Sequence, residues 1–453
     1  MSKTNDTTRA IFTTRIGAVA TAVGSAVGLG NIWRFPFEAG SHGGGAFMAC
    51  YLVFIIALGI PVICAEFILG RHTRSNEPRA FRTLAPGTPW HLVGYIGILA
   101  SILILSFYSV VAGWTLEYLT ASFSMFTNDM DTADYHTRFG QFISGNWRPV
   151  IWTVTFLAIN FLILLRGVQK GIERLSNILM PVMFLLLVIF CVNSLLMPKA
   201  SEGLYFLFHP DFSQITPSVL LGAMGQAFFS LSIGLGCMMT YGSYFSPRTN
   251  LLRCASVTAI LDTGVAILAG IIIFPAVFSF GISPESGPTL VFEVFPTIFS
   301  QLHGGMFWSI LFFFLLFLAS LTSTISMSEI SITYFMEEYR LSRLRATMLT
   351  IGIATMLGLL CALSFGPLRH FTVCGMTIFN LFDYLSSNIL LPLGGMLISI
   401  FAGWIIDKHI ISTQLSESPA SHPSRWIRPV IFCLRYVAPV GIALIFMNSI
   451  GII

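Results

Sequence analysis

Long apolar segments dominate this chain of 453 residues and limit what it can fold into. A segment of about 20 apolar residues is long enough to cross the hydrocarbon core of a bilayer as a helix. Hydrophobic residues make up 55% of the chain and charged residues only 10%, whereas roughly 25% of the residues of a soluble domain are charged. The sequence therefore predicts an all-α polytopic membrane protein with eleven spans, at residues 16–37, 45–70, 92–124, 150–166, 173–197, 217–245, 254–280, 306–337, 344–365, 376–406 and 427–450.

The basic residues of the predicted loops indicate the orientation of these spans. Arginine and lysine concentrate in the cytoplasmic loops of membrane proteins. Placing the N-terminus in the cytoplasm leaves only Arg138, Arg148, Lys199 and Arg369 on the outer side. With an odd number of spans, the C-terminus is then expected outside. We expect four parts: residues 1–15 as a cytoplasmic segment, 16–200 as spans 1–5, 201–406 as spans 6–10, and 407–453 as a loop with span 11.

Two predicted spans contain residues that suit neither a helix nor hydrocarbon. Span 1 carries "GSAVGLGNIWRFP" at residues 24–36, and span 6 carries "GQAFFSLSIGLG" at residues 225–236. Gly24 and Gly28 alone also fit a close helix-packing motif, but that interpretation leaves Asn31 unexplained. If spans 1–5 and 6–10 are inverted repeats, the interruptions fall at matching positions. Such a pair is an established indication of the binding site of a secondary transporter.

Four of the ionisable residues inside predicted spans stand out: Arg34, Glu66, Asp262 and Asp383. Each costs about 2.5–3.5 kcal/mol on insertion scales and is therefore a functional candidate. We expect Glu66 to accept hydrogen bonds from N–H groups that an unwound helix leaves free. Arg34 and Asp383 approach the outer ends of their spans and are expected to pair. Asp262 has no basic partner nearby in the sequence, which favours a bound cation.

Span 8 contains an unusual density of hydroxyl groups in "FLASLTSTISMSE". Ala319, Thr322 and Ser323 offer only oxygen ligands, which suit a hard cation. The eight cysteines are scattered, and the spans hold no serine–histidine pair, so neither a transition-metal site nor an enzyme is predicted. The net charge of +4 is too small to indicate binding to nucleic acid.

Together, "GSAVGLGNIWRFP", "GGGAF", "GQAFFSLSIGLG", "TYGSY" and "LTSTIS" resemble the neurotransmitter:sodium symporters over nearly the whole chain. The segments "LDTGVAIL" and "LFDYLSSNILLPLGG" resemble the bacterial eleven-helix branch of multi-hydrophobic amino acid transporters. The resemblance implies a 5+5 inverted repeat with helices 1 and 6 unwound. It also implies sodium-coupled symport of an amino acid across a bacterial inner membrane by alternating access.

For the substrate, the resemblance implies a pocket between helices 1, 3, 6 and 8. The carboxylate would meet the N–H groups of Leu29 and Gly30 and the hydroxyl of Tyr108, and the amino group would meet carbonyls near Ala26 and Phe229. The substrate-binding residues carried over in this way are Ala26, Leu29, Gly30, Ile104, Tyr108, Phe229, Ser230, Ser232, Leu235, Ser323 and Met327.

The resemblance also implies two sodium sites and two gates. The first site is implied at Ala26, Asn31, Ser230, Asp262 and the substrate carboxylate, and the second at Gly24, Val27, Ala319, Thr322 and Ser323. The outer gate is implied at Arg34 and Asp383 above a lid of Tyr108 and Phe229, and the inner gate at Arg9, Tyr244 and Glu337.

Four departures from the family pattern refine these expectations. Gly28 stands where monoamine transporters carry aspartate, which favours an amino acid substrate. Asp262 replaces a common asparagine, while Ala266 stands where some chloride-independent relatives are acidic, so Asp262 is expected to make chloride unnecessary. Phe12 stands where relatives usually carry tryptophan. No twelfth span is predicted, so the oligomeric state of twelve-helix relatives is not implied.

Two other classes of function share parts of this pattern. A channel or a non-transporting amino-acid sensor would use the same pocket but would not need residues for two opposed gates. A transporter coupled only to protons is disfavoured by the hydroxyl-rich cation site in span 8.

Overall fold

The computed structural model describes residues 10–125, 132–281, 290–415 and 426–449, and these residues are almost entirely helical. In the first half the elements are α1 (Arg15–Ala26), η1 (Gly30–Arg34), α2 (Phe35–Ser41), α3 (Gly45–Phe54), η2 (Ile55–Gly59), α4 (Ile60–Thr73), α5 (Glu77–Leu84), α6 (His91–Met125), α7 (Thr132–Ile143), α8 (Arg148–Leu164), η3 (Val168–Glu173), α9 (Arg174–Leu195), α10 (Ala200–Phe208) and η4 (Phe212–Gln214). In the second half they are α11 (Pro217–Ser230), α12 (Cys237–Gly242), α13 (Leu251–Ser279), η5 (Leu290–Val294), α14 (Phe295–Ser300), α15 (Gly305–Glu338), α16 (Arg343–Leu363), β1 (Thr372–Val373), β2 (Met376–Thr377), α17 (Ile378–Tyr384), η6 (Leu385–Leu390), α18 (Leu391–Ile400), η7 (Phe401–Ile405), α19 (Lys408–Leu415), α20 (Ile427–Phe432), η8 (Cys433–Val437) and α21 (Ala438–Ser449).

Many helices of the chain are long enough to span a membrane. Among the described residues, eight helices are long and apolar enough to cross a membrane, or ten if each of two bent pairs is one span. The pair Arg15–Ala26 with Gly30–Ser41 bends by 51°. The predicted span at 217–245 is divided into α11 and α12, and each of these helices is too short to count as a membrane span. A membrane protein with many helical spans is thus confirmed, while the number eleven and the inverted repeat stay predictions.

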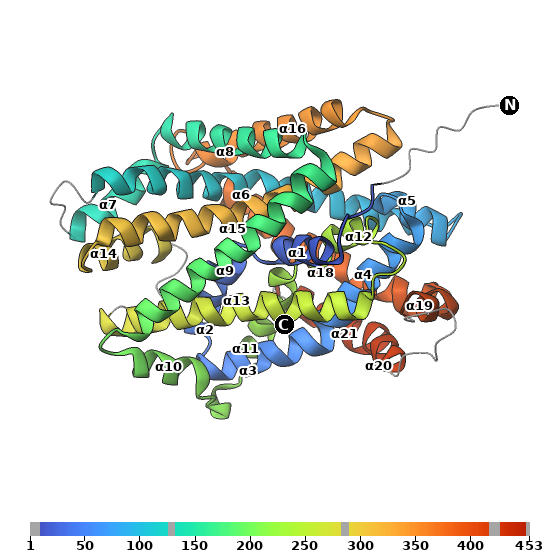
Figure 1. The fold of residues 1–453 in the computed structure, drawn as a ribbon, viewed down its shortest axis with the longest axis horizontal. Coiled ribbons are helices and arrows are strands. Elements are labelled where there is room, and N and C mark those ends of the chain that lie inside the picture. Colours follow the sequence, from blue (N-terminus) through green and yellow to red (C-terminus); the bar gives the residue numbers. More distant parts are fainter. Residues whose placement is uncertain (1–9, 126–131, 282–289, 416–425, 450–453) are drawn as a thin grey trace.

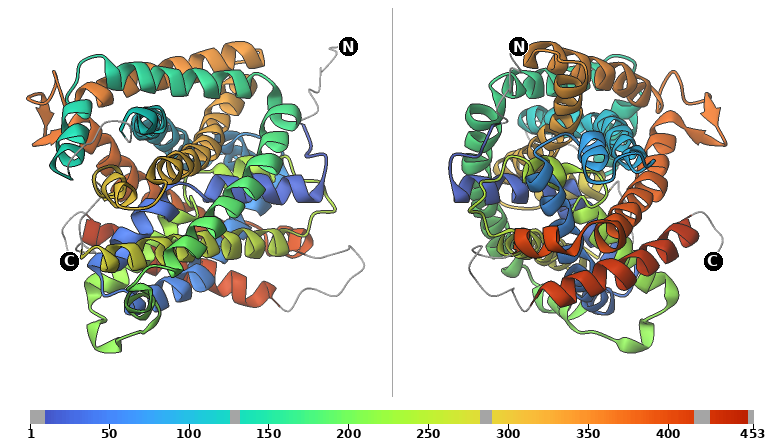
Figure 2. Two further views of the ribbon diagram at one scale, coloured as in Figure 1. Left: turned by 60° about the vertical axis from the view of Figure 1, so that its left-hand side comes forward. Right: turned by 90° about the vertical axis from the view of Figure 1, so that its right-hand side faces the viewer.

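The long helices form a bundle around α6 and α15, which pack against each other along much of their length (Figure 1). On one side of this pair α8 and α16 cover it. On the other side lie α1 and α13, and α9 crosses both of them at an angle (Figures 1 and 2). The two interruptions, in contrast to the exposed starts of their helices, therefore lie inside the bundle and are surrounded by protein.

The first interruption separates α1 from η1. Val27 leaves the helix with extended angles, φ −70° and ψ 119°. The N–H group of Gly28 donates to Asn31 Oδ1 at 3.0 Å, and the N–H group of Leu29 donates to the hydroxyl of Tyr108 at 2.9 Å. Because side chains replace the lost helical bonds, the backbone can stay open inside the membrane.

The second interruption separates α11 from α12. Ser232, Gly234 and Gly236 adopt φ angles of 53°, 84° and 81°, a left-handed region in which glycine carries no steric cost. The N–H group of Gly234 donates to Glu66 Oε1 on α4 at 2.9 Å. Glu66 is fully buried. The expectation that Glu66 satisfies an unwound backbone is confirmed.

Replacing Glu66 tests this role in the fold. Glu66→Leu leaves the buried N–H group of Gly234 without an acceptor, so we expect unfolding to become easier by about 1–3 kcal/mol. Glu66→Gln keeps an acceptor oxygen of similar shape and should lose less. Thermal unfolding of the purified protein in detergent measures both. Equal unfolding temperatures for the two variants would contradict this assignment.

Candidate functional site

The two interruptions meet around a small cavity of ≈ 30 Å³ in the middle of the bundle. Ten of the eleven predicted substrate residues line it. The eleventh, Leu29, donates its N–H group to Tyr108, which is one of the lining side chains. The sequence prediction did not include the two remaining lining residues, Gly28 and Leu391. The full lining is Ala26, Gly28, Gly30, Ile104, Tyr108, Phe229, Ser230, Ser232, Leu235, Ser323, Met327 and Leu391.

Asp262 on α13 forms a buried polar cluster beside this cavity. Its Oδ1 accepts a hydrogen bond from Asn31 Nδ2 at 2.7 Å, and its Oδ2 accepts one from the hydroxyl of Ser230 at 2.6 Å. All three residues are at most 2% exposed. In the described part of the chain, no arginine, lysine or histidine forms an ion pair with Asp262. A buried carboxylate with only neutral partners is costly, and a bound cation would remove that cost.

A second cluster of oxygen atoms joins the end of α1 to α15. The hydroxyl of Ser323 donates to the carbonyl of Val27 at 3.2 Å and to that of Ala319 at 3.3 Å. The hydroxyl of Thr322 donates to Ala319 at 3.1 Å. A Cβ atom on Gly24 would lie 3.6 Å from Thr322 Cβ, so the fifth predicted ligand is adjacent. The cluster offers hydroxyl and carbonyl oxygens, which suit a hard cation.

Transition metals have no comparable site. The described residues contain no group of three or more histidine, cysteine, aspartate or glutamate side chains arranged to hold a metal ion. The two oxygen clusters are therefore the cation-binding candidates in this part of the molecule.

A larger cavity of ≈ 440 Å³ adjoins the small one and shares Gly30, Tyr108 and Phe229 with it. The guanidinium carbon of Arg34 lies 4.3 Å from the centre of the Phe229 ring. Phe229 thus separates the two cavities, with Arg34 lying over its ring. This geometry agrees with a lid built from Tyr108 and Phe229.

Arg34 and Asp383 line the larger cavity without pairing with each other. Arg34 Nε lies 3.4 Å from Glu38 Oε1, and Asp383 Oδ1 accepts a hydrogen bond from the hydroxyl of Ser387 at 3.0 Å. The proposed outer-gate residues therefore face the same space but hold other partners in this conformation.

The cluster around Tyr244, at the other end of the bundle, contains residues that the sequence prediction did not include. The hydroxyl of Tyr244 donates to Glu329 Oε1 at 2.8 Å, and Arg343 Nη2 lies 2.7 Å from Glu329 Oε2. Glu329 is fully buried. The sequence analysis missed Glu329, although the rule for ionisable residues in apolar spans would have found it in "SMSEI". Arg9 lies outside the described residues.

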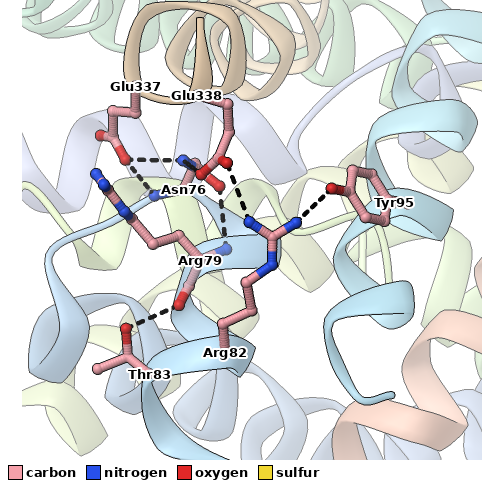
Figure 3. A network of polar contacts seen from close by, with 7 residues as sticks. All are labelled: Asn76, Arg79, Arg82, Thr83, Tyr95, Glu337 and Glu338. Atoms are coloured by element: carbon pink, nitrogen blue, oxygen red, sulfur yellow. Dashed lines mark hydrogen bonds and ion pairs between the residues drawn. The ribbon is translucent and has the colours of Figure 1, made fainter. Parts of the chain in front are cut away.

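Glu337, at the end of α15, belongs to a separate network (Figure 3). It accepts hydrogen bonds from the N–H group of Asn76 at 2.7 Å and from Asn76 Nδ2 at 3.0 Å. Asn76 also donates to Glu338, and Arg82 joins Glu338 to Tyr95. Glu337 therefore holds the end of α15 to the segment that begins α5.

The N-terminal segment is anchored beside the Tyr244 cluster. The ring of Phe12 packs against those of Tyr241, Tyr244 and Phe245 at centroid distances of 5.8–6.1 Å. Glu173 accepts hydrogen bonds from the N–H groups of Thr13 and Thr14 just before α1. This contact was not predictable from the sequence, because Glu173 lies at the edge of a predicted span like other charged residues. The start of α1 is thus held to the start of α9.

Gln226 is a further polar residue of the interrupted region that the sequence analysis did not single out. Its Nε2 donates to the carbonyl of Gly30 at 3.0 Å, and the side chain is fully buried. A glutamine inside the apolar segment "GAMGQAFFS" was a usable signal, because a polar side chain in a membrane helix needs a partner.

Comparisons with known proteins agree on the kind of molecule that carries this site. The sequence model described as the sodium:neurotransmitter symporter family matches residues 9–138 and 142–453. An uncharacterized sodium-dependent transporter of Bacillus subtilis, YhdH, is 38% identical over 442 residues, 98% of each chain. An uncharacterized sodium-dependent transporter of Haemophilus influenzae is 35% identical over 461 residues, 99% of each chain. The crystal structure of MhsT in complex with L-phenylalanine matches with a TM-score of 0.90 and 42% identity, covering 97% of this chain and 100% of MhsT.

The pair of Glu329 and Arg343 gives a test of the Tyr244 cluster. Glu329→Leu leaves a mostly buried guanidinium without its carboxylate, so we expect a loss of about 3–5 kcal/mol of stability. Tyr244→Phe removes one hydrogen bond and should lose about 1 kcal/mol. The double variant Glu329→Leu, Arg343→Leu should recover part of the larger loss. Chemical unfolding in detergent measures all three, and a double variant less stable than Glu329→Leu would disprove the coupling.

Proposed function

The chain belongs to the sodium:neurotransmitter symporter family, and on this premise we propose that it is a sodium-coupled symporter of hydrophobic L-amino acids. It works by alternating access, does not require chloride, and lies in a bacterial inner membrane with its N-terminus in the cytoplasm. The observation that carries the proposal is the buried Asp262 carboxylate. This group lies between the two interrupted helices, next to the central cavity, with no basic partner among the described residues.

Two sodium ions fit the two oxygen clusters. The first ion binds Asp262, Asn31, Ser230, the carbonyl of Ala26 and the substrate carboxylate. In this structure Asp262 accepts hydrogen bonds of 2.6–2.7 Å from Asn31 and Ser230, and the ion replaces these bonds when it binds. The second ion replaces the hydrogen bonds of Ser323 and Thr322 and binds the carbonyls of Gly24, Val27 and Ala319 with these hydroxyls.

The substrate occupies the central cavity between the interrupted helices. Its carboxylate accepts a hydrogen bond from the N–H group of Leu29, which donates to the Tyr108 hydroxyl at 2.9 Å in this structure. The carboxylate then lies at the start of a helical segment, where a negative charge is stabilised. A cavity of ≈ 30 Å³ has room for roughly one water molecule, so a hydrophobic amino acid enters only when Phe229 and its neighbours move apart. The L-phenylalanine bound by the similar protein MhsT supports a substrate of this class.

Sharing a carboxylate couples ion and substrate, because each then raises the affinity of the other by the same factor. One charge that moves inward through about 100 mV releases about 2.3 kcal/mol, and a tenfold sodium gradient adds about 1.4 kcal/mol. Two ions supply roughly 7 kcal/mol for one zwitterion, which supports about 10⁵-fold accumulation, whereas one ion supports only about 500-fold.

The proposed gates lie at the two ends of the site. On the outer side, closure brings Arg34 and Asp383 together across the cavity of ≈ 440 Å³ that both of them line. On the inner side, Tyr244 and Glu337 act with Arg9, and the buried pair of Glu329 and Arg343 supports Tyr244.

Transport into vesicles tests the proposal directly. Proteoliposomes with an inward sodium gradient should accumulate L-phenylalanine above the outside concentration, and collapse of the gradient should abolish accumulation. Uptake that only equilibrates would indicate a channel, and binding without uptake would indicate a sensor. Accumulation driven equally by a proton gradient without sodium would overturn the coupling ion.

Asp262→Asn tests the site of the first ion. The substitution keeps the shape of the side chain but removes the charge that balances the cation. We expect sodium-dependent uptake to fall by tenfold or more at low sodium, or to become dependent on chloride. Uptake should be measured in chloride and in gluconate media. Wild-type uptake in both media would remove Asp262 from the site, and collapse of wild-type uptake in gluconate would refute chloride independence.

Gly28 tests the space needed beside the substrate. A Cβ atom at this position would lie 2.5 Å from Ser323 Oγ and 2.9 Å from the Tyr108 hydroxyl. Gly28→Ala should therefore weaken substrate binding at least tenfold. Gly225→Ala on α11 is the matched control, because a Cβ atom there meets no other atom within 4 Å. Equal affinities of the two variants in a binding assay would contradict the placement of the substrate.

A further inference from the structure

A second large cavity lies on the outside of the bundle, away from the central site. It is a groove of ≈ 620 Å³ between α1, α9 and α13, which pack against one another (Figure 1). Its walls are mostly apolar and come from all three helices, among them Val19, Val23, Phe184, Val257 and Leu261.

Three arginines surround one end of the groove: Arg15 at the start of α1, Arg248 before α13, and Arg253 in the first turn of α13. All three are exposed. None of them forms an ion pair in the part of the chain that the structure describes, and no acidic residue lines the groove. Three uncompensated positive charges therefore stand beside an apolar slot.

We propose that this groove binds an anionic phospholipid, with its phosphate group among Arg15, Arg248 and Arg253 and an acyl chain along the apolar walls. The arrangement has the two properties that such a lipid requires in one place. Guanidinium groups form paired, charge-assisted hydrogen bonds with phosphate oxygens. Basic pockets between membrane helices on the cytoplasmic side bind anionic head groups, and the N-terminal end of α1 is the end expected there.

Binding of a soluble phosphate compound would account for fewer features of the groove than binding of a phospholipid. It would use the three arginines but would leave the apolar walls on α9 and α13 uncovered. Val257 and Leu261 follow Arg253 along α13 at four-residue intervals, so they lie on the same face, one and two turns further from the charged end. The order of charge and then apolar surface is that of a phospholipid, from head group to chain.

The bound lipid would connect the first half-helix to its neighbours. Arg15 belongs to α1, whereas Arg248 and Arg253 belong to the other side of the groove. Met180, which lines the groove on α9, would lie 3.5 Å from a Cβ atom at Gly24 on α1. A phosphate shared by the three arginines thus ties α1 to α13 across α9, and the lipid stabilises the contacts that this structure displays.

Native mass spectrometry of the full chain in detergent tests the proposal. The probes are phosphatidylglycerol and phosphatidylcholine with identical acyl chains. We expect the first bound phosphatidylglycerol to dissociate at a concentration at least tenfold lower than phosphatidylcholine. In the triple variant Arg15→Gln, Arg248→Gln, Arg253→Gln this preference should disappear. Unchanged preference in the triple variant would overturn the proposal.

A matched control separates the groove from general surface charge. The triple variant Arg345→Gln, Lys408→Gln, Arg428→Gln removes the same charge from exposed positions elsewhere and should retain the preference. An equal loss in both triple variants would refute a defined site. Unfolding temperatures without added lipid show that each variant is folded.

Blocking the apolar wall gives an independent measurement. Val257→Trp fills the groove without changing charge and should weaken phosphatidylglycerol binding at least threefold. Glycerol 3-phosphate carries the same phosphate without acyl chains and should not displace the lipid at equal concentration. Full binding in Val257→Trp, or displacement by glycerol 3-phosphate, would overturn the acyl-chain part and with it the assignment to a lipid.

Discussion

Inside a bilayer every backbone N–H and carbonyl group must find a partner within the protein, and this constraint governs how the chain opens its helices. At the first interruption Asn31 and Tyr108 accept the hydrogen bonds of Gly28 and Leu29. At the second, Glu66 accepts that of Gly234. Tyr108 also lines the central cavity, and Asn31 also donates to Asp262 beside it, so the fold and the site share these side chains.

Charged side chains in the same region also need partners, because burying an unpaired charge in a medium of low dielectric constant costs free energy. Glu329 has Arg343 as a partner at 2.7 Å, whereas Asp262 has only Asn31 and Ser230. Two carboxylates that are equally buried thus have different kinds of partner. The paired one stabilises a contact between helices, and the unpaired one leaves a negative charge that a mobile cation can balance. This difference is the physical basis of the proposed sodium coupling.

Local signals in the sequence predicted much of this arrangement. Glycines within apolar spans located both interruptions, and the motifs that resemble the symporter family identified nearly all residues around the cavity. Contacts set by packing were not predictable in this way. Glu173 reaches Thr13 across 160 positions, and Glu329 on α15 meets Tyr244, which lies 85 positions earlier in the chain. The relation of Arg34 to Asp383 depends on conformation, which a sequence does not specify.

The two ends of the central cavity are held by interactions of unequal strength. At the N-terminal end of α1, the buried carboxylates of Glu329 and Glu173 accept charge-assisted hydrogen bonds from Arg343 and from Thr13 and Thr14. At the other end Arg34 lies over Phe229, and Asp383 faces an open cavity. Separating the first end breaks several strong bonds, whereas widening the second requires only the movement of a ring. In the proposed transport cycle, the free energy of binding ions and substrate must therefore be directed mainly at releasing α1.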